Sequence, residues 1–131
     1  MDIAEHARQG IEAFNRREFD TTLAGFDPEI EWEAAADLGP DPKVYRGHAG
    51  VLEFWDTWLA TMDDFELEVT ECRDAPGERV FVTARARGKG KGSGAPVEGD
   101  LHQVFQYEAG TVVRVKLCGS RSAALEAAGL G

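Results

Sequence analysis

LHQVFQYEAGTVVRVKLCGSRSAALEAAGLG, residues 101–131, is the stretch that decides the fold. Its two apolar runs alternate with polar residues and flank a Glu-Ala-Gly turn, which predicts a β-hairpin. The Ala- and Leu-rich end predicts a short C-terminal helix. Because the first half of the chain is rich in helix patterns, we expect helices to cover a curved antiparallel sheet. That arrangement forms a cone with a pocket for a small molecule inside.

Length and composition predict one globular domain spanning residues 1–131. Of these residues, 43% are hydrophobic and 29% are charged, as in ordinary soluble domains. The formal net charge of −10 argues against non-specific binding to nucleic acid or to an anionic membrane, since both of these are negative. We therefore expect neither nucleic acid nor a membrane among the partners.

Signal and cysteine patterns favour a cytoplasmic location. The N-terminal segment has no basic and apolar signal pattern, and no apolar run approaches the ~20 residues that span a bilayer. The two cysteines, Cys72 and Cys118, lie far apart and form no CxxC motif. We expect both to be reduced thiols.

Periodicity in the first half predicts helices over 3–17 and 48–62, with a short helix between them whose N-cap is Asp20. Alternation over 29–33 predicts a half-buried strand. The segment 34–47 is rich in Gly and Pro, so we expect a loop there. Its length is typical of a functional loop and suggests a lid over the pocket.

A period of two replaces the helical period after residue 64. It predicts strands over 65–70 and 80–91, followed by the closing hairpin. Cations alternate through the second of these strands and share one face, where we expect them to pair with Glu66 and Glu68 rather than with RNA. Helices gathered on one face of an antiparallel sheet, with a short helix at the end, make an α+β domain.

The phrases FNRREFD, IEWEAA, VYRGHAGVLEFW and AALEAAGL carry a family resemblance over nearly the whole chain. They resemble the SnoaL-like branch of the nuclear transport factor two-like (NTF2-like) superfamily, which includes the ketosteroid isomerases. The resemblance implies a cone-shaped fold with a pocket between the concave sheet face and the helices. It also implies a homodimer, which we expect to form through the outer sheet face. This fold hosts enzymes and non-catalytic binders alike, so it assigns no activity by itself.

Gln103 is the expected polar anchor of the pocket. Alternation in the closing hairpin turns it inward, together with Val113 on the next strand. A mostly aromatic lining with one amide is typical of a site for a small, mostly apolar molecule. The residues expected to line the pocket are Phe14, Trp32, Tyr45, Trp55, Trp58, Gln103, Phe105, Tyr107, Val115 and Leu117.

Acid/base sites known in the superfamily are not kept in this chain. Ketosteroid isomerases use an Asp base, with a Tyr and a protonated Asp as oxyanion donors. In an approximate alignment, the base falls near Ala34, the protonated Asp near Gln103 and the Tyr near Gly10 or Ile11. SnoaL-type cyclases use an Asp and a His on the last strands, and no acid points inward there in this chain. Neither chemistry is predicted.

Three side chains remain as catalytic candidates. Glu33 lies nearest the expected pocket mouth and Asp37 lies in the expected lid, so either would act as a general base if it were buried there. We interpret both as solvated carboxylates. His102 alternates with Gln103 and is expected on the outer face, at the sheet surface or in a dimer contact.

No metal and no cofactor are predicted, because the three histidines are scattered and show no ligand spacing. Three functions remain open: an enzyme with isomerase-like or cyclase-like acid/base chemistry, a protein that binds a ligand without changing it, and a dimerisation module with a closed interior. A carboxylate or histidine in the pocket would favour the enzyme. A purely aromatic and amide lining would favour the binder.

Overall fold

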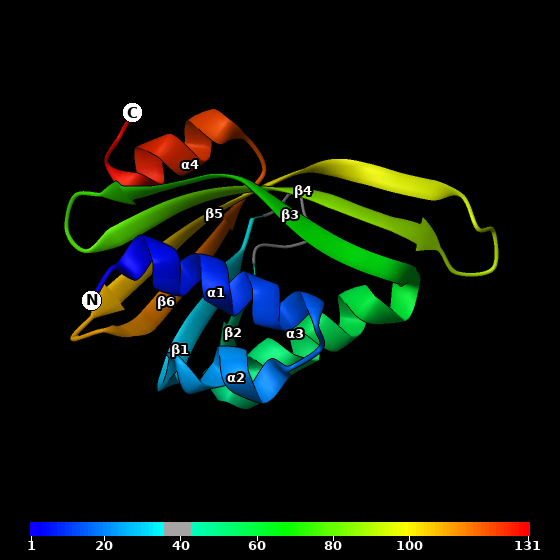
Figure 1. Cartoon of the computed structure of the whole chain (residues 1–131), viewed down its shortest axis with the longest axis horizontal. Coiled ribbons are helices and arrows are strands. Elements are labelled where there is room, and N and C mark those ends of the chain that lie inside the picture. Colours follow the sequence, from blue (N-terminus) through cyan, green and yellow to red (C-terminus); the bar gives the residue numbers. More distant parts are fainter. Residues whose placement is uncertain (36–42) are drawn as a thin grey trace.

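The computed structural model describes residues 1–35 and 43–131. The helices in these ranges are α1 (Ile3–Asn15), α2 (Phe19–Ala24), α3 (Gly47–Thr61) and α4 (Arg121–Ala128). The strands are β1 (Phe26–Ala34), β2 (Lys43–Arg46), β3 (Met62–Ala75), β4 (Arg79–Gly90), β5 (Pro96–Glu108) and β6 (Thr111–Cys118). They form one sheet in the order β2-β1-β6-β5-β4-β3 (Figure 1). The α+β class predicted from the sequence is confirmed.

The sheet is curved and open, with β2 at one edge and β3 at the other. Neighbouring strands are antiparallel except for β1 and β6, which run parallel. The parallel pair forms because the first strand of the chain is inserted beside the last one. The sheet is therefore mixed, whereas the sequence pattern predicted antiparallel pairing throughout.

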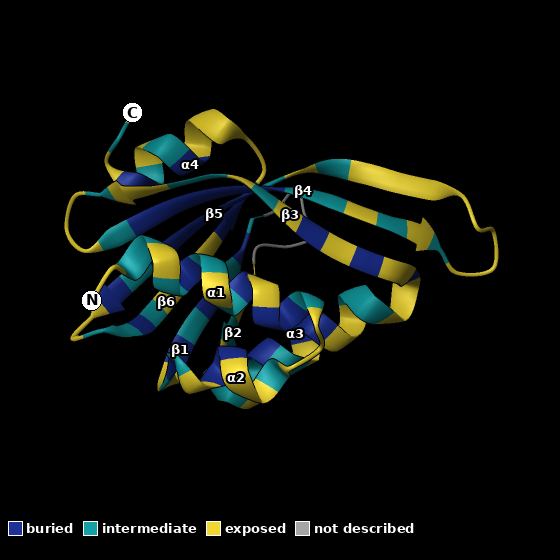
Figure 2. Cartoon of the chain, viewed as in Figure 1, coloured by how far each residue is buried: buried dark blue, intermediate teal, exposed yellow. Residues whose placement is uncertain are grey.

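Helices cover the two faces of the sheet unequally. α1, α2 and α3 lie against the inner, concave face, and α4 packs on the outer face (Figure 1). The inner core includes Ile30, Val51 and Tyr107, none of which is exposed. A smaller core under α4 includes Phe81 and Ala124. Figure 2 shows that burial is concentrated where helices cover the strands, while the tip of the β4–β5 hairpin is exposed.

Capping residues set the ends of α1 and α4. The Asp2 side chain accepts a hydrogen bond from the backbone N–H of Glu5 at 3.2 Å, and Ser120 accepts one from Ala123 at 3.1 Å. Each bond satisfies a backbone donor that the first turn of a helix cannot pair. α4 ends at Gly129, whose φ of 77° is the left-handed conformation that glycine adopts without strain.

Local structure differs from the sequence prediction in the first half of the chain. β2 lies within the segment expected to be a loop, because four residues are too few for a periodic pattern to show. α2 begins at Phe19 after Glu18, rather than after an Asp20 cap. Phe26 is the first residue of β1. The expected lid lies partly outside the described residues.

The closing hairpin contains a register shift that alternation alone does not reveal. An irregularity between Gln106 and Tyr107 pairs Tyr107 with Val112. Such a bulge moves one strand by a residue relative to its partner. Val112 therefore packs in the inner core at 1% exposure, whereas Val113, which was expected to face inward, is only half-buried.

The side chain of Asn15, the last residue of α1, forms two hydrogen bonds with the edge strand β3. Its Nδ2 donates to the carbonyl oxygen of Leu67 at 2.8 Å, and its Oδ1 accepts from the Leu67 N–H at 2.9 Å. Arg17 donates to the carbonyl oxygen of Phe65 at 2.6 Å. These bonds give α1 a fixed position over the inner face, because they join a helix end to peptide groups that no strand pairs.

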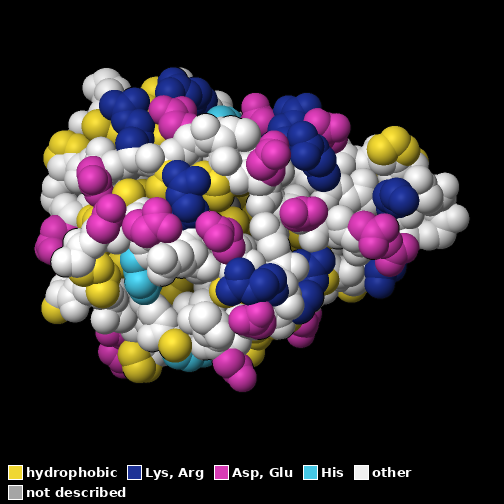
Figure 3. Space-filling model, viewed as in Figure 1, with side chains coloured by type: hydrophobic (Ala, Val, Ile, Leu, Met, Phe, Trp, Pro, Cys, Tyr) yellow, Lys and Arg dark blue, Asp and Glu magenta, His cyan; other side chains and the backbone are white. Residues whose placement is uncertain are grey.

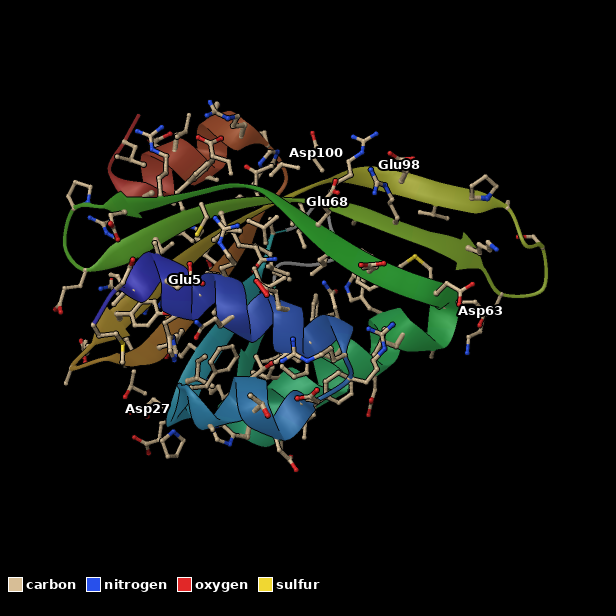
Figure 4. The ribbon with its side chains drawn as sticks, viewed as in Figure 1. Glu5, Asp27, Asp63, Glu68, Glu98 and Asp100 are labelled. Carbon is tan, nitrogen blue, oxygen red and sulfur yellow. The ribbon has the colours of Figure 1, made fainter. Side chains whose placement is uncertain are left out.

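Ion pairs cross the outer face of the sheet. Arg85 donates to Glu98 at 2.7 Å and to Asp100 at 3.1 Å, and Arg87 lies 3.5 Å from Glu68. The β4 cations were expected to pair with acids of β3. Arg87 does so, whereas Arg85 pairs with acids of β5. Figure 4 shows Glu68, Glu98 and Asp100 on the side of the sheet away from α1, and Figure 3 shows charges of both signs interspersed on the surface. Exposed pairs of this kind each contribute at most about 1 kcal/mol.

Candidate functional site

A cavity of about 210 Å³ lies between the inner face of the sheet and α1, α2 and α3. Its wall is largely apolar because alternate residues of β1, β3, β5 and β6 face the same side as the buried stripes of the helices. The apolar lining residues are Ile11, Phe14, Phe26, Trp32, Phe54, Trp55, Trp58, Met62, Phe65, Leu67, Ala86, Val97, Leu101, Phe105 and Leu117. The remaining lining residues are Gly10, Thr22, Arg87, Glu98, Gly99, Asp100 and Gln103.

Trp55 stands at the centre of the aromatic wall. Its ring centroid lies 5.2 Å from that of Phe14, 5.3 Å from that of Phe19 and 5.9 Å from that of Trp32. The Trp32 contact is edge-to-face at 89°, an arrangement in which the positive ring edge meets the negative ring face. These contacts hold the aromatic rings in place around the hollow.

Gln103 is the polar side chain buried most deeply in the wall. It lies on the inner face of β5 with 3% of its surface exposed. Among the described residues, no hydrogen bond involves its side-chain amide. An unpaired buried polar group costs about 1–3 kcal/mol, so such groups normally have a partner. Gln103 is therefore a buried amide in the cavity wall whose hydrogen-bonding groups no described residue uses.

Trp32 supplies a second polar atom in need of a partner. Its Nε1 is buried and has no hydrogen-bond partner among the described residues, and the residue is 5% exposed. The indole nitrogen can only donate. Because this nitrogen is fully covered by surrounding atoms, it does not face the hollow, and Gln103 remains the buried amide of the cavity wall.

The structure brings most of the predicted pocket residues together. Tyr45 does not line the cavity but packs on Phe54, with ring centroids 5.2 Å apart. Val115 is fully buried behind the wall, and Tyr107 lines a neighbouring cavity instead. The predicted residues that do line the cavity are Phe14, Trp32, Trp55, Trp58, Gln103, Phe105 and Leu117.

Phe54 is a lining residue that the sequence pattern did not single out. It precedes Trp55 in α3 and contacts both Trp32 and Trp58, at 5.6 Å and 6.2 Å between ring centroids. Its spacing of four from Trp58 was the available signal, since residues four apart share a helix face. Met62 and Phe65 were also missed as lining residues, because β3 begins directly at the end of α3.

The described catalytic candidates lie away from the cavity. Glu33 is on the outer face, 3.5 Å from Lys116. His102 is also on the outer face, but only 8% exposed, and its Nδ1 lies 2.9 Å from the Thr83 hydroxyl. It is thus buried in the layer near α4 rather than displayed on the sheet surface. Asp37 lies outside the described residues.

A smaller cavity of about 100 Å³ adjoins the larger one and is lined in part by His6 and Tyr107. The Tyr107 hydroxyl lies 2.7 Å from His6 Nδ1, and the two rings meet edge-to-face at 5.5 Å. Burial raises the pKa of Tyr107, and the nearby Cys72 thiolate would act in the same direction. The phenol therefore keeps its proton in the folded protein.

The raised pKa of Tyr107 predicts a loss of stability in alkali. An unfolded chain releases a tyrosine proton near pH 10, whereas the folded chain holds it to higher pH. Unfolding therefore releases a proton above about pH 10, and the free energy of unfolding falls by up to about 1.4 kcal/mol per pH unit. Below that pH, Tyr107 does not contribute to the pH dependence of the free energy of unfolding. We expect Tyr107→Phe to remove this decrease of the free energy of unfolding with pH. Urea unfolding at pH values between about 8 and 11.5 measures it.

The matched control is Tyr45→Phe, which changes the other tyrosine of the chain. Equal losses of slope in the two variants, or an unchanged slope in Tyr107→Phe, would contradict the assignment of the alkaline transition to Tyr107.

Two further findings concern the described residues alone. No three His, Cys, Asp or Glu side chains among them are grouped so as to hold a metal ion. None of the helices in the described ranges has the length and apolar character needed to cross a membrane.

Comparisons with known proteins agree with the geometry of the fold. A model of the SnoaL-like domain matches residues 7–115. No curated protein matches the chain. One similar solved structure is an NTF2-like protein of unknown function from Burkholderia pseudomallei, with 21% identity and a TM-score of 0.79 over 98% of both chains.

Two other solved structures are similar to this chain. TerC, co-crystallised with polyporic acid, has 22% identity and a TM-score of 0.77 over 93% of this chain and 94% of that one. A proposed polyketide cyclase from Sinorhizobium meliloti has 20% identity and a TM-score of 0.65 over 82% of this chain and 88% of that one. At these identities the likeness shows a shared fold alone.

Proposed function

Since the chain belongs to the SnoaL-like domain family, we propose that it binds a small, flat, mostly apolar molecule in the cavity between the sheet and the helices. The observation that carries this proposal is Gln103, a buried amide without a described partner in the wall of an aromatic cavity. The ligand supplies the missing hydrogen bond, and its rings stack within the aromatic wall.

The volume of the cavity sets the size of the ligand. An apolar cavity of about 150 Å³ binds benzene, and pockets for drug-sized molecules begin at about 300 Å³. The cavity of about 210 Å³ falls between these sizes. We therefore infer a ligand with one or two fused rings.

The amide of Gln103 sets the chemistry of the ligand. It both donates and accepts hydrogen bonds. A carbonyl or hydroxyl group on the ring pairs with this amide, whereas a pure hydrocarbon leaves it unpaired. The likeness to TerC, which was crystallised with polyporic acid, and to a proposed polyketide cyclase supports a small organic ligand.

Binding without acid/base chemistry is the function that the lining favours. The described acids in the lining, Glu98 and Asp100, have their side chains on the outer side of the sheet, where both accept hydrogen bonds from Arg85. The Arg85 guanidinium holds the pKa of Glu98 below its usual range. A general base that works at neutral pH needs the opposite shift. We therefore propose a protein that binds its ligand and leaves it unchanged.

Calorimetric titration with 2-naphthol and naphthalene tests the proposal, since these probes differ by one hydroxyl group. We expect Gln103→Leu to weaken 2-naphthol binding roughly three- to tenfold, the effect of one hydrogen bond, and to leave naphthalene binding unchanged. The melting temperature should change little, because no described hydrogen bond is lost.

The control is Gln106→Leu, which changes the same residue type on the same strand. The amide of Gln106 donates to the Gly77 carbonyl oxygen, away from the cavity. Failure of the wild-type protein to bind either probe at millimolar concentration would refute the proposal. A large loss of stability in Gln103→Leu with unchanged binding would make Gln103 a structural residue instead.

A further inference from the structure

The two cavities share part of their wall. Gly10, Thr22, Phe26 and Phe105 line both the larger apolar cavity and the smaller one of about 100 Å³. The two hollows therefore adjoin, and these shared residues form the partition between them. They differ in character, because the smaller one also has His6 and other polar groups in its lining.

Gly10 is the residue of this partition that has no side chain. Glycine inside a helix costs about 1 kcal/mol relative to alanine, so its presence in the middle of α1 calls for a reason. A Cβ atom built on Gly10 would meet only the Thr22 methyl group, at 3.8 Å, which is an ordinary contact. Packing therefore does not exclude a side chain here. A longer side chain at this position would instead reach into the space between the cavities.

The polar end of the smaller cavity is held in one geometry. The His6 ring is fixed by the Tyr107 hydroxyl at 2.7 Å and by edge-to-face contact with the Tyr107 ring. The ring also lies close to the backbone of Gly25, where a Cβ atom would be 2.6 Å from Cε1 and 2.8 Å from Nε2 of His6. Such contacts do not occur in proteins, so Gly25 is what allows His6 to occupy this position.

The tautomer of His6 follows from its partner. Tyr107 is fully buried, and among the described residues the only group that meets its hydroxyl is His6 Nδ1. A buried hydroxyl donates where it has one acceptor, so Nδ1 accepts and the imidazole proton is on Nε2. No described residue accepts a hydrogen bond from Nε2. The smaller cavity therefore has a donor fixed in place and without a partner.

We propose that the two cavities are the two halves of one binding site joined past Gly10. The rings of the ligand lie in the larger cavity. A flexible arm passes Gly10 into the smaller cavity and ends in a neutral oxygen acceptor, such as a ketone, that accepts from Nε2–H of His6. This inference rests on the proposed function and adds the shape of the ligand to it.

Two probes with the same ring test the polar end of the site. 4-(2-Naphthyl)butan-2-one has an arm that ends in a ketone, and 2-butylnaphthalene has an arm of equal length without oxygen. We expect the wild-type protein to bind the ketone roughly three- to tenfold more tightly, the range for one neutral hydrogen bond. His6→Ala should abolish this preference, and Gln103→Leu should keep it.

The reverse pattern would overturn the inference, because a preference lost in Gln103→Leu and kept in His6→Ala places the ketone on Gln103. The proposed function would then still stand. Equal binding of the two probes by the wild-type protein would overturn the inference in the same way. Absence of binding by both probes, while 2-naphthol binds, would overturn the inference alone, whereas absence of binding by 2-naphthol and naphthalene as well would overturn the proposed function.

Gly10→Leu tests the passage, and Gly10→Ala is its size control. We expect the leucine to weaken both probes with arms about tenfold more than it weakens naphthalene, because Gly10 borders the larger cavity but only the arm needs the passage. The alanine should keep the binding of all three compounds and raise the melting temperature, since it improves helix propensity. Equal weakening of naphthalene and of the probes with arms by Gly10→Leu would overturn the passage.

Discussion

Trp55→Ala is expected to lower the free energy of unfolding by about 3–5 kcal/mol, the range for removing a buried aromatic side chain. Trp55 is 5% exposed and contacts Phe14, Phe19, Phe26 and Trp32 through its ring. Because it borders an existing hollow, its loss enlarges that hollow, and the fixed rings around it cannot close the gap. Domains of this size are stabilised by about 5–15 kcal/mol in total, so the variant should be close to unfolding.

Urea unfolding followed by far-UV circular dichroism measures this effect without relying on tryptophan fluorescence. The control is Trp58→Ala, which changes the tryptophan three residues further along the same face of α3. Trp58 is half-buried and contacts Phe54 and Phe65 at centroid distances above 6 Å. We expect a loss of roughly 1–2 kcal/mol for this variant. Equal losses in the two variants would show that Trp55 is not the centre of the aromatic wall.

Gly99→Phe is expected to weaken the binding of 2-naphthol at least tenfold while the fold is retained. Gly99 lies on β5 in the lining of the cavity, opposite Ala86 of β4. A Cβ atom at Gly99 would meet nothing within 4 Å, so the backbone accepts a side chain there. The phenyl ring then occupies space that the ligand needs. The strand itself gains from the change, because glycine weakens strands and phenylalanine favours them.

Gly99→Ala is the matched control, since it removes the glycine but adds only a methyl group. We expect it to bind 2-naphthol within about twofold of the wild-type protein, because one methyl group fills little of a cavity of about 210 Å³. Calorimetric titration measures both variants. Unchanged affinity in Gly99→Phe would mean that 2-naphthol binds elsewhere, and this result would contradict the proposed site.

The fold was predictable because its strongest signals are local. A period of 3.6 indicated α1 and α3, a period of two indicated the long strands, and the closing hairpin has an evident turn. β2 was not predictable, because four residues show no period and the strand is defined by its pairing with β1. The parallel pairing of β1 with β6 is likewise a long-range contact between segments distant in the sequence. No local pattern encodes such a contact.

The candidate site was predictable in its character rather than in all of its members. Alternation placed Gln103 and Phe105 on the inner face, and both line the cavity. Alternation did not indicate Val112 as a core residue, because the bulge before Tyr107 shifts the register of β6. The Tyr107–His6 contact joins residues 101 positions apart, so no spacing in the sequence indicates it. Sequence reasoning therefore missed the smaller cavity.

Self-association through the outer sheet face stays a prediction. α4 covers part of that face, over Phe81 and Val104. The face also carries ion pairs, including Arg114 with Glu31 at 3.1 Å. Light scattering at micromolar concentration would decide the matter, and a mass of one chain would contradict the expected dimer.

Edge strands can recruit strands from other molecules, and this recruitment is a common route to aggregation. β3 is an edge strand of fourteen residues. On that edge, Asn15 and Arg17 already form hydrogen bonds with the peptide groups of Leu67 and Phe65. A strand from another molecule therefore cannot pair with these groups. The end of the helix that covers the cavity thus also blocks strand pairing from outside at this part of the edge.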